Sequence, residues 1–516
     1  MKNQALGTSL LIFGLLLFNF LFWQETPGIN FILFSSFLIG LAYFRERKTA
    51  FRKEVYYAGV AAFISGIMVV WHNSGWSVFM HFLTVFITIG FIKQKRITTV
   101  FEGTLAFLVN YFSSPVAWLN ELKNRKKENK AFALTYSFIK LCVIPGVIFI
   151  LFFIIYQNAN PKFEELTHSF TQSIADIFKE FSFTRFFFLL FGFSIVSVAF
   201  VKSYVSIGAF ASCEDDLVRT RRKDVKSPIQ ASSNLFAEFK NEYKIGLLIF
   251  GVLNLLLLIV NIIDIKWIWF DFEVPLEFNL KSFVHEGTYL LIFSILLSMV
   301  IFLYFFRGSF NFYSKNKGLR VLGKVWIIQN IILTLSVFIR NFHYINYHGL
   351  AGKRIGVIAF LLMTVFGLIS LIVKMDKLKT TAYLVRLNGW FILITMTMMT
   401  CVNWDRMVVH YNLGHENAGE IDVDYYLKLN VTTAPLVLKN LDIVAAQMEA
   451  HKNRKDKAIW LRYVDIEMFK EQLEYRTSKY LKRMEDDNWA SWNWADYKLK
   501  KTTKLMPLEE EPQAFN

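Results

Sequence analysis

Residues 288–306 read TYLLIFSILLSMVIFLYFF, nineteen consecutive residues that include no charged side chain. Because a helix needs roughly 20 apolar residues to cross the hydrocarbon core of a bilayer, this stretch predicts a transmembrane helix. Ten further stretches of the same character are found along the chain. The eleven predicted spans are residues 5–23, 29–44, 55–71, 76–92, 132–156, 185–209, 244–263, 288–306, 321–340, 354–373 and 384–403.

The composition excludes an ordinary soluble protein. Of the 516 residues, 54% are apolar and only 19% are charged, whereas soluble domains carry about 25% charged residues. A disordered chain would combine low hydrophobicity with high charge, the opposite of what is found. Three scattered cysteines provide no disulfide framework and no thiolate metal site. We therefore predict an all-α protein, a polytopic transmembrane bundle of about eleven spans.

The charges predict how this bundle is oriented. Residues 1–404 carry 40 Lys and Arg against 22 Asp and Glu, whereas residues 405–516 carry 17 against 19. The basic excess lies in every second loop, which the positive-inside rule assigns to the cytoplasm. The N-terminus is then cytoplasmic and the C-terminal region extracytoplasmic. Because the net charge of +16 comes from these loops, it indicates contact with anionic lipid headgroups and no nucleic-acid partner.

Two further segments predict helices that lie along the membrane surface. Residues 97–119 are apolar, but basic clusters flank both ends and Glu102 and Pro115 interrupt the run. A twelfth span here would place one basic cluster outside, so we expect a helix in the cytoplasmic interface. In residues 162–181 the apolar positions recur at intervals of three and four, which predicts a second amphipathic surface helix.

The composition changes near residue 405, where charged residues become frequent and long apolar runs stop. We predict a transmembrane domain at residues 1–404 and a helical extracytoplasmic module at 405–503, with helices at 433–449 and 456–484. The run Trp489-Ala-Ser-Trp-Asn-Trp494 is expected to pack against the helices of this module. Residues 504–516, rich in Glu and Pro, predict a disordered tail.

Several motifs of the sequence, taken in chain order, resemble those of one protein family. They are Phe283-Val-His-Glu-Gly-Thr-Tyr289, Gly349-Leu350, Lys353-Arg354-Ile-Gly-Val357, Phe366-Gly-Leu368, Asn403-Trp-Asp405, Tyr411-Asn-Leu413, Ile421-Asp-Val-Asp-Tyr-Tyr-Leu427 and the tryptophan run. Over residues 180–500 the chain is similar to the bacterial polytopic membrane proteins of the domain-of-unknown-function 4153 and 4173 type. The resemblance implies an integral protein of the bacterial cytoplasmic membrane and no particular reaction. That family usually has Tyr-Gly-Leu-Thr where this chain has His348-Gly-Leu-Ala351, so this chain lacks the threonine hydroxyl.

The predicted topology gathers ionisable residues at the outer ends of the later spans. The candidate polar cluster consists of His285, Glu286, Arg340, His343, Arg354, Asp405 and His410. Such groups most often solvate the interface, cap helices and pair with one another. The alternative is a metal site built from His285, His343, Asp405 and His410, because catalytic zinc needs three such ligands and an open position. Their spacing matches no known zinc signature, so zinc is only an alternative and no cofactor is predicted.

The remaining motifs narrow the functional classes. The sequence contains no GxxxxGK[ST], GxGxxG or GxSxG motif for nucleotide or serine-hydrolase chemistry. Mid-span polar residues are few and none is acidic, which disfavours an ion-coupled pump. We predict a non-enzymatic envelope component in signalling or scaffolding, with the bilayer and other envelope proteins, through residues 405–503, as partners. A membrane-embedded metal-dependent enzyme is the alternative, and a small-solute transporter is third.

Overall fold

The computed structural model describes residues 2–46, 51–125, 153, 162–163, 167, 182–201, 215–216, 228–270, 280–307, 316–452 and 465–504. Eight of its helices are long and apolar enough to cross a membrane, and two shorter apolar helices, Ser9–Phe22 and Ile29–Arg45, precede them. These helices confirm the predicted all-α polytopic bundle, and the chain is a multi-pass membrane protein. Apart from residue 153, the predicted span at 132–156 lies outside the described residues.

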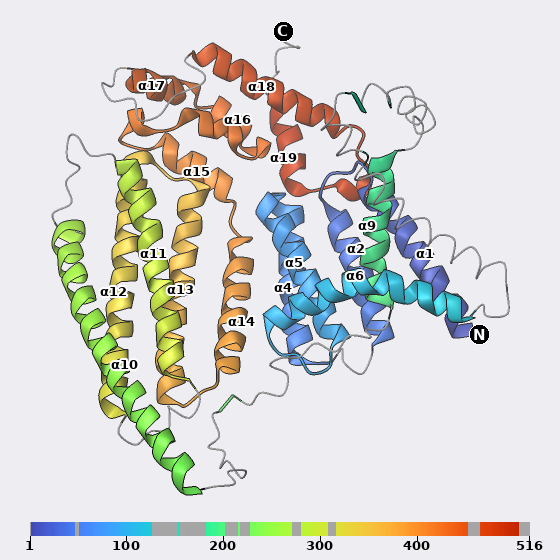
Figure 1. Ribbon diagram of the computed structural model, residues 1–516. Coiled ribbons are helices and arrows are strands. Elements are labelled where there is room, and N and C mark those ends of the chain that lie inside the picture. The colour runs from blue at the N-terminus through green and yellow to red at the C-terminus, as the bar shows by residue number, and fades with distance from the viewer. Residues whose placement is uncertain are drawn as a thin grey trace.

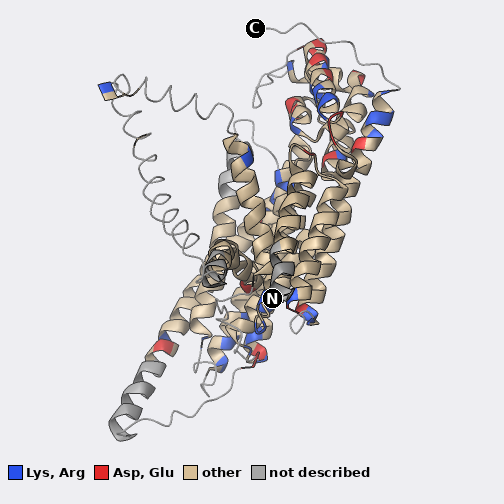
Figure 2. Ribbon diagram, turned by 90° about the vertical axis from the view of Figure 1, so that its right-hand side faces the viewer, with Lys and Arg blue, Asp and Glu red and all other residues tan. Residues whose placement is uncertain are grey.

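Charge and exposure support a membrane setting for the helices. Lys, Arg, Asp and Glu gather at the two ends of the bundle, and most of the length between them carries none (Figure 2). Large apolar side chains project outward along this stretch; Phe293 is 64% exposed and Leu255 62%. Such a surface would be unfavourable in water and is the expected surface of helices in contact with lipid.

Helices α1, α2, α4, α5, α6 and α9 form a first half-bundle, on the right of Figure 1. Its buried core is rich in phenylalanine, with Phe18, Phe34 and Phe91 among its members. Helix α6 runs crosswise to α4 and α5 near the end of the bundle that carries the N-terminus (Figure 1). That course is the one expected of a helix lying along a membrane surface, as the sequence predicts for 97–119. The described helices of this half are α1 (Lys2–Phe22), α2 (Ile29–Arg45), α4 (Lys53–His72), α5 (Gly75–Lys93), α6 (Val100–Arg125) and α9 (Phe183–Phe200).

Helices α10 to α13 form a second half-bundle, and α14 packs between the two halves (Figure 1). Trp390 of α14 stacks on Phe91 of the first half at 5.6 Å between ring centroids, while Leu384 joins the core of the second. These helices are α10 (Pro228–Asp264), which continues into the π-helix η1 (Ile265–Phe270), α11 (Leu280–Phe305), α12 (Lys317–His348), α13 (Gly352–Asp376) and α14 (Thr381–Met399).

Residues from 404 onward fold into a helical module over one end of the bundle, which we call the module end (Figure 1). The helix predicted at 433–449 is interrupted, because the side chain of Asn440 donates to the carbonyl of Leu436 (2.7 Å) and the chain turns there. The predicted surface helix at 162–181 and the predicted tail lie almost entirely outside the described residues. The elements of the module are α15 (Trp404–Leu413), η3 (Ala418–Glu420), η4 (Val423–Lys428), η5 (Val431–Thr433), α16 (Ala434–Leu438), α17 (Leu441–Lys452), α18 (Ile466–Arg483), η6 (Trp489–Ser491) and α19 (Trp494–Thr503).

Amide side chains join α10 to α12 within the membrane. Asn254 donates to the carbonyl of Leu322 (3.1 Å) and accepts from the Gln329 amide (2.8 Å). Two helical turns further along α10, Asn261 donates to the carbonyl of Gln329 (3.1 Å). Hydrogen bonds between helices in lipid contribute roughly 0.6 to 2 kcal/mol each, and they also fix the register of the two helices.

Replacing Asn254 with leucine leaves the Gln329 amide without its partner in an apolar setting. We expect Asn254→Leu to lower the free energy of unfolding by about 1 kcal/mol, measured as a lower melting temperature in detergent. Leu255→Ala, at the neighbouring lipid-facing position, is the control and should be nearly neutral. An Asn254→Leu protein that melts with the wild type would contradict the role given to this contact.

Candidate functional site at the module end

The module rests on three helix-to-helix turns that meet at the module end. They are the α1–α2 turn at residues 23–28, the α4–α5 turn at 73–74 and the α12–α13 turn at 349–351. The first two belong to one half-bundle and the third to the other. The module therefore contacts both halves of the membrane domain (Figure 1).

The α12–α13 turn is held by one asparagine of the module. Asn412 accepts from the backbone N–H of Leu350 (2.6 Å) and donates to its carbonyl (2.9 Å). The preceding residue, Gly349, has φ +78°, and a Cβ there would lie 2.6 Å from the Asn412 side-chain oxygen. Only glycine meets both constraints without strain. Gln447 then donates to the Asn412 carbonyl (2.8 Å), which connects the turn to the interior of the module.

Buried ionisable groups surround this turn. His348 Nδ1 lies 3.0 Å from Glu420 Oε2, and both side chains are nearly inaccessible. Arg354 donates to the carbonyl of His348 (2.9 Å) and lies over the ring of Tyr344, 4.3 Å from its centroid. Burial raises the pKa of the nearby Asp422 carboxyl, an effect that the Lys428 charge opposes. Among these groups, Arg354 binds the backbone of the turn directly.

The α1–α2 turn is held by the tryptophan-rich segment of the module. Glu25 accepts from the backbone N–H of Asn488 (2.8 Å) and from the hydroxyl of Ser491 (2.6 Å). Thr26 donates from its hydroxyl to Asp487 (2.5 Å). A Cβ at Gly28 would overlap the carbonyl of Ser491, so the two backbones meet directly at this point.

Asp496 holds the α4–α5 turn to the module. Its carboxylate accepts from the amides of Asn73 (3.0 Å) and Asn493 (2.5 Å) and from the Tyr480 hydroxyl (3.1 Å). Burial raises the pKa of Asp496, while these three donors act in the opposite direction. Burial also raises the pKa of Tyr480. Asn430 completes the contact by donating to the carbonyl of Asn73 (2.9 Å).

Three of the predicted cluster residues lie at the module end of α12 and α13, each with its own partner. Arg340 forms a buried ion pair with Asp264 at the end of α10, 2.5 Å between Nη2 and Oδ1. The Nε2 atom of His343 lies 3.0 Å from the carbonyl of Ile268. Arg354 binds the α12–α13 turn, as described above. These contacts are those of residues that stabilise helix ends.

Of the other cluster residues, Asp405 and His410 are on α15 and are not brought together with these three. Asp405 accepts from the backbone N–H of Asn430 (3.1 Å), and His410 is exposed on the opposite face of α15. His285 and Glu286 lie in the first turns of α11, but their side chains are outside the described part. Within the described residues, no three His, Cys, Asp or Glu side chains converge as a metal site would require.

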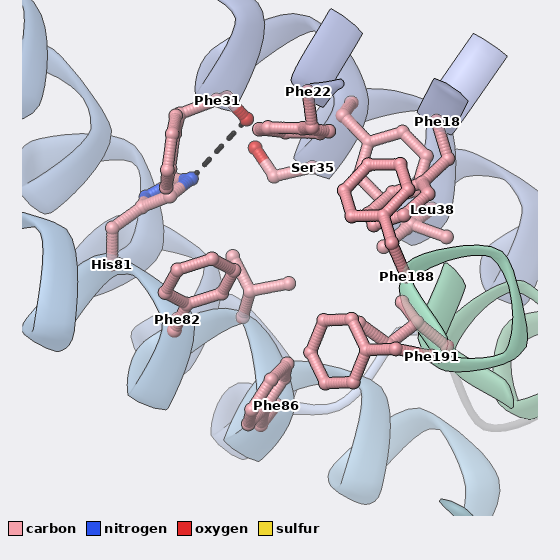
Figure 3. Close-up of a pocket in the computed structure, with 13 residues that line it drawn as sticks. Phe18, Phe22, Phe31, Ser35, Leu38, His81, Phe82, Phe86, Phe188 and Phe191 are labelled. Atoms are coloured by element: carbon pink, nitrogen blue, oxygen red, sulfur yellow. Dashed lines mark hydrogen bonds between the residues drawn. The ribbon is translucent and has the colours of Figure 1, made fainter. Parts of the chain in front are cut away.

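A small apolar cavity lies within the first half-bundle. It has a volume of about 160 Å³, and phenylalanines from α1, α2, α5 and α9 surround it (Figure 3). His81 stands at its edge, with Nε2 3.3 Å from the carbonyl of Phe31 (Figure 3) and Nδ1 3.0 Å from that of Ala62. The cavity is below the roughly 300 to 1,000 Å³ of most ligand pockets, so we regard it as a packing defect.

The residues that form the module contacts differ from those that the charge pattern selects. Asn412, Glu420 and Asp496 were not among the candidates, and each meets its partner far away in the sequence. One signal was available, because Gly349-Leu350, Tyr411-Asn-Leu413, Ile421–Leu427 and the tryptophan run were already singled out as motifs. The structure shows that the first three of these motifs meet one another at the α12–α13 turn, and that the tryptophan run meets the α1–α2 turn.

Comparison with known proteins identifies one family. The model of a family described as a domain of unknown function, DUF4153, matches residues 58–440, which is more than half of the chain. No curated protein and no solved structure matches the chain.

Ala351 occupies the N-cap position of α13, where its side chain forms no capping hydrogen bond. The hydroxyl of a threonine at this position would accept from a free N–H of the first turn. We expect Ala351→Thr to raise the free energy of unfolding by about 1 kcal/mol, measured by thermal unfolding in detergent. Ala351→Val has the same shape without the hydroxyl and should give no gain; an equal gain from both would contradict this explanation.

An alanine at Gly349 must adopt a left-handed backbone and displace Asn412. We expect Gly349→Ala to destabilise the protein by about 1 to 3 kcal/mol. Hydrogen exchange should then increase first in α15 and at Leu350, where the hydrogen bonds to Asn412 are lost. Gly356→Ala is the matched control, because nothing lies within 4 Å of a Cβ at that position. If both variants behave alike, the contact with Asn412 is not what restricts residue 349.

Proposed function

Since the chain belongs to the DUF4153 family, whose description assigns no activity, we propose a role from its geometry: an envelope scaffolding component that acts through its C-terminal module. The observation that supports this proposal is the attachment of the module. Buried hydrogen bonds fix it to turns of both half-bundles, at Glu25, Asn73 and Leu350. A module held in this way keeps a constant position on the membrane and can present a fixed surface to a partner.

The orientation that we propose places the module outside a bacterial cytoplasmic membrane. Basic side chains gather at the opposite end of the bundle, among them Arg52 and Arg386, which bind loop residues, and Arg320, which binds the last turn of α13. The positive-inside rule assigns this basic end to the cytoplasm. The N-terminus lies toward the same end (Figure 1) and is then cytoplasmic.

The surface offered to a partner is the outward face of α18. Phe469, Leu473 and Thr477 face the core of the module, whereas Met468 and Tyr475 are 55% and 44% exposed on the other side. Met468 and Tyr475 are two turns apart on one face, and charged residues of both signs flank them. Exposed Met and Tyr within a charged rim are typical of protein interfaces. The chemistry fits a folded envelope protein as partner.

Photo-crosslinking in living cells tests this proposal. A photoreactive phenylalanine analogue is placed at Tyr475, at Met468 or, as a lipid-facing control, at Phe293 on α11. We expect one and the same envelope protein to crosslink at both α18 positions and not at Phe293. Adducts with different proteins at the two positions, or none at either when the protein is present at its normal level, would refute a scaffolding role for this face.

A further inference from the structure

A groove lies between α4 of the first half-bundle and α14. Its volume is about 650 Å³, within the roughly 300 to 1,000 Å³ range of ligand sites. Along most of its length the walls are apolar or aromatic, with Tyr57, Val60 and Ile64 on α4 and Trp390, Ile394 and Met398 on α14. Several of these side chains are exposed, Ile394 by 53% and Met398 by 58%, so the groove opens toward the surrounding lipid.

The groove runs along most of α14 and about half of α4. Its α14 wall extends from Tyr383 to Met398, which at about 1.5 Å per residue is roughly 22 Å. Its α4 wall, from Lys53 to Ile64, is roughly 16 Å long, close to the ~15 Å of half a hydrocarbon core. The groove begins at the basic end of the bundle, where an acyl chain can enter it from that leaflet.

The end of the groove at the membrane surface is polar and carries a surplus of positive charge. Glu54 is 3.2 Å from Arg52, and Asp215 is bound by Arg386, whose Nε donates to the hydroxyl of Thr98 (2.9 Å). Both acids are thus neutralised by an arginine. Lys53 adds an exposed cation at the same end. An anionic group lying here would meet Lys53 and the outer edge of the Arg386 guanidinium.

The aromatic wall of the groove is fixed by contacts on its far side. The Trp390 indole donates to the carbonyl of Thr98 (3.2 Å) and stacks on Phe91. Tyr57 meets Trp390 edge-on across the groove, 5.9 Å between ring centroids. A fixed concave wall loses little conformational entropy on binding, which distinguishes it from the convex lipid-facing surfaces of the other helices.

We propose that this groove is a binding site for one glycerophospholipid of the leaflet at the basic end. The phosphodiester is held by Lys53 and Arg386, and one acyl chain lies between α4 and α14 against Trp390. The lipid fills the space that the two half-bundles leave beside α14. This inference is independent of the scaffolding role, because it concerns a different surface. The orientation proposed above decides only whether that leaflet is called cytoplasmic.

Native mass spectrometry of the full-length protein tests the site. The protein is extracted in mild detergent and the phospholipid bound per chain is counted. The wild type should retain one phospholipid. Val60→Trp, which fills the groove, should lower the retained fraction by about tenfold. Leu297→Trp is the matched control on lipid-facing α11, where Leu297 is 47% exposed, and it should retain the lipid.

A second pair of variants tests the headgroup contact. Lys53→Gln should weaken retention while Lys53→Arg preserves it, and added inorganic phosphate should not displace the lipid because the acyl chain holds it. Melting temperatures near that of the wild type establish that the variants are folded. The proposal is overturned if the wild type retains no phospholipid, if Val60→Trp retains it fully, or if Leu297→Trp loses it equally, since the lipid would then be annular. Displacement by phosphate alone would also overturn it.

Discussion

The structure depends on the attachment of the C-terminal module to three turns of the membrane domain. Turns expose backbone groups that helices leave unpaired, and burying them beneath a module is tolerated only when each finds a partner. Asn412, Asn493 and Asn430 supply such partners to the backbone of the α12–α13, α1–α2 and α4–α5 turns. Because these turns belong to different half-bundles, the same contacts that satisfy the backbone also hold the two halves together.

The attachment explains why polar groups collect at the module end without forming a reaction centre among the described residues. Arg340, Arg354 and Asp405 each bind a helix end, a turn or a 3₁₀ segment. At the opposite end the halves meet mainly along α14, and the groove beside α14 is left open. The module is fixed at one end of the bundle, and the proposed lipid site lies toward the other end. Together they would define the separation of the two half-bundles at both ends.

The sequence predicts the spans because their signal is local. An apolar run such as 288–306 is long enough to cross a bilayer whatever surrounds it, and the charge alternation orders the loops. The contacts at the module end are not local; Glu25 meets Ser491 across 466 residues. Of the predicted polar cluster, Arg340, His343 and Arg354 lie at the module end, each with its own partner. The type of a side chain and its predicted depth in the membrane do not determine which charged groups pair. The motifs around Gly349 and Asn412, in contrast, mark residues that are in contact.

Distance measurement by pulsed electron paramagnetic resonance tests the central claim most directly. Spin labels are attached at Phe63→Cys on α4 and Leu362→Cys on α13, both lipid-facing, in protein lacking its native cysteines. The account predicts one narrow distance distribution in otherwise wild-type protein. Gly28→Val, which collides with the Ser491 carbonyl, should broaden it. A control pair within one half, Phe63→Cys with Leu33→Cys, should stay narrow in both proteins. An unchanged distribution between the two halves, with the module shown by hydrogen exchange to be detached, would contradict the claim that the module holds them together.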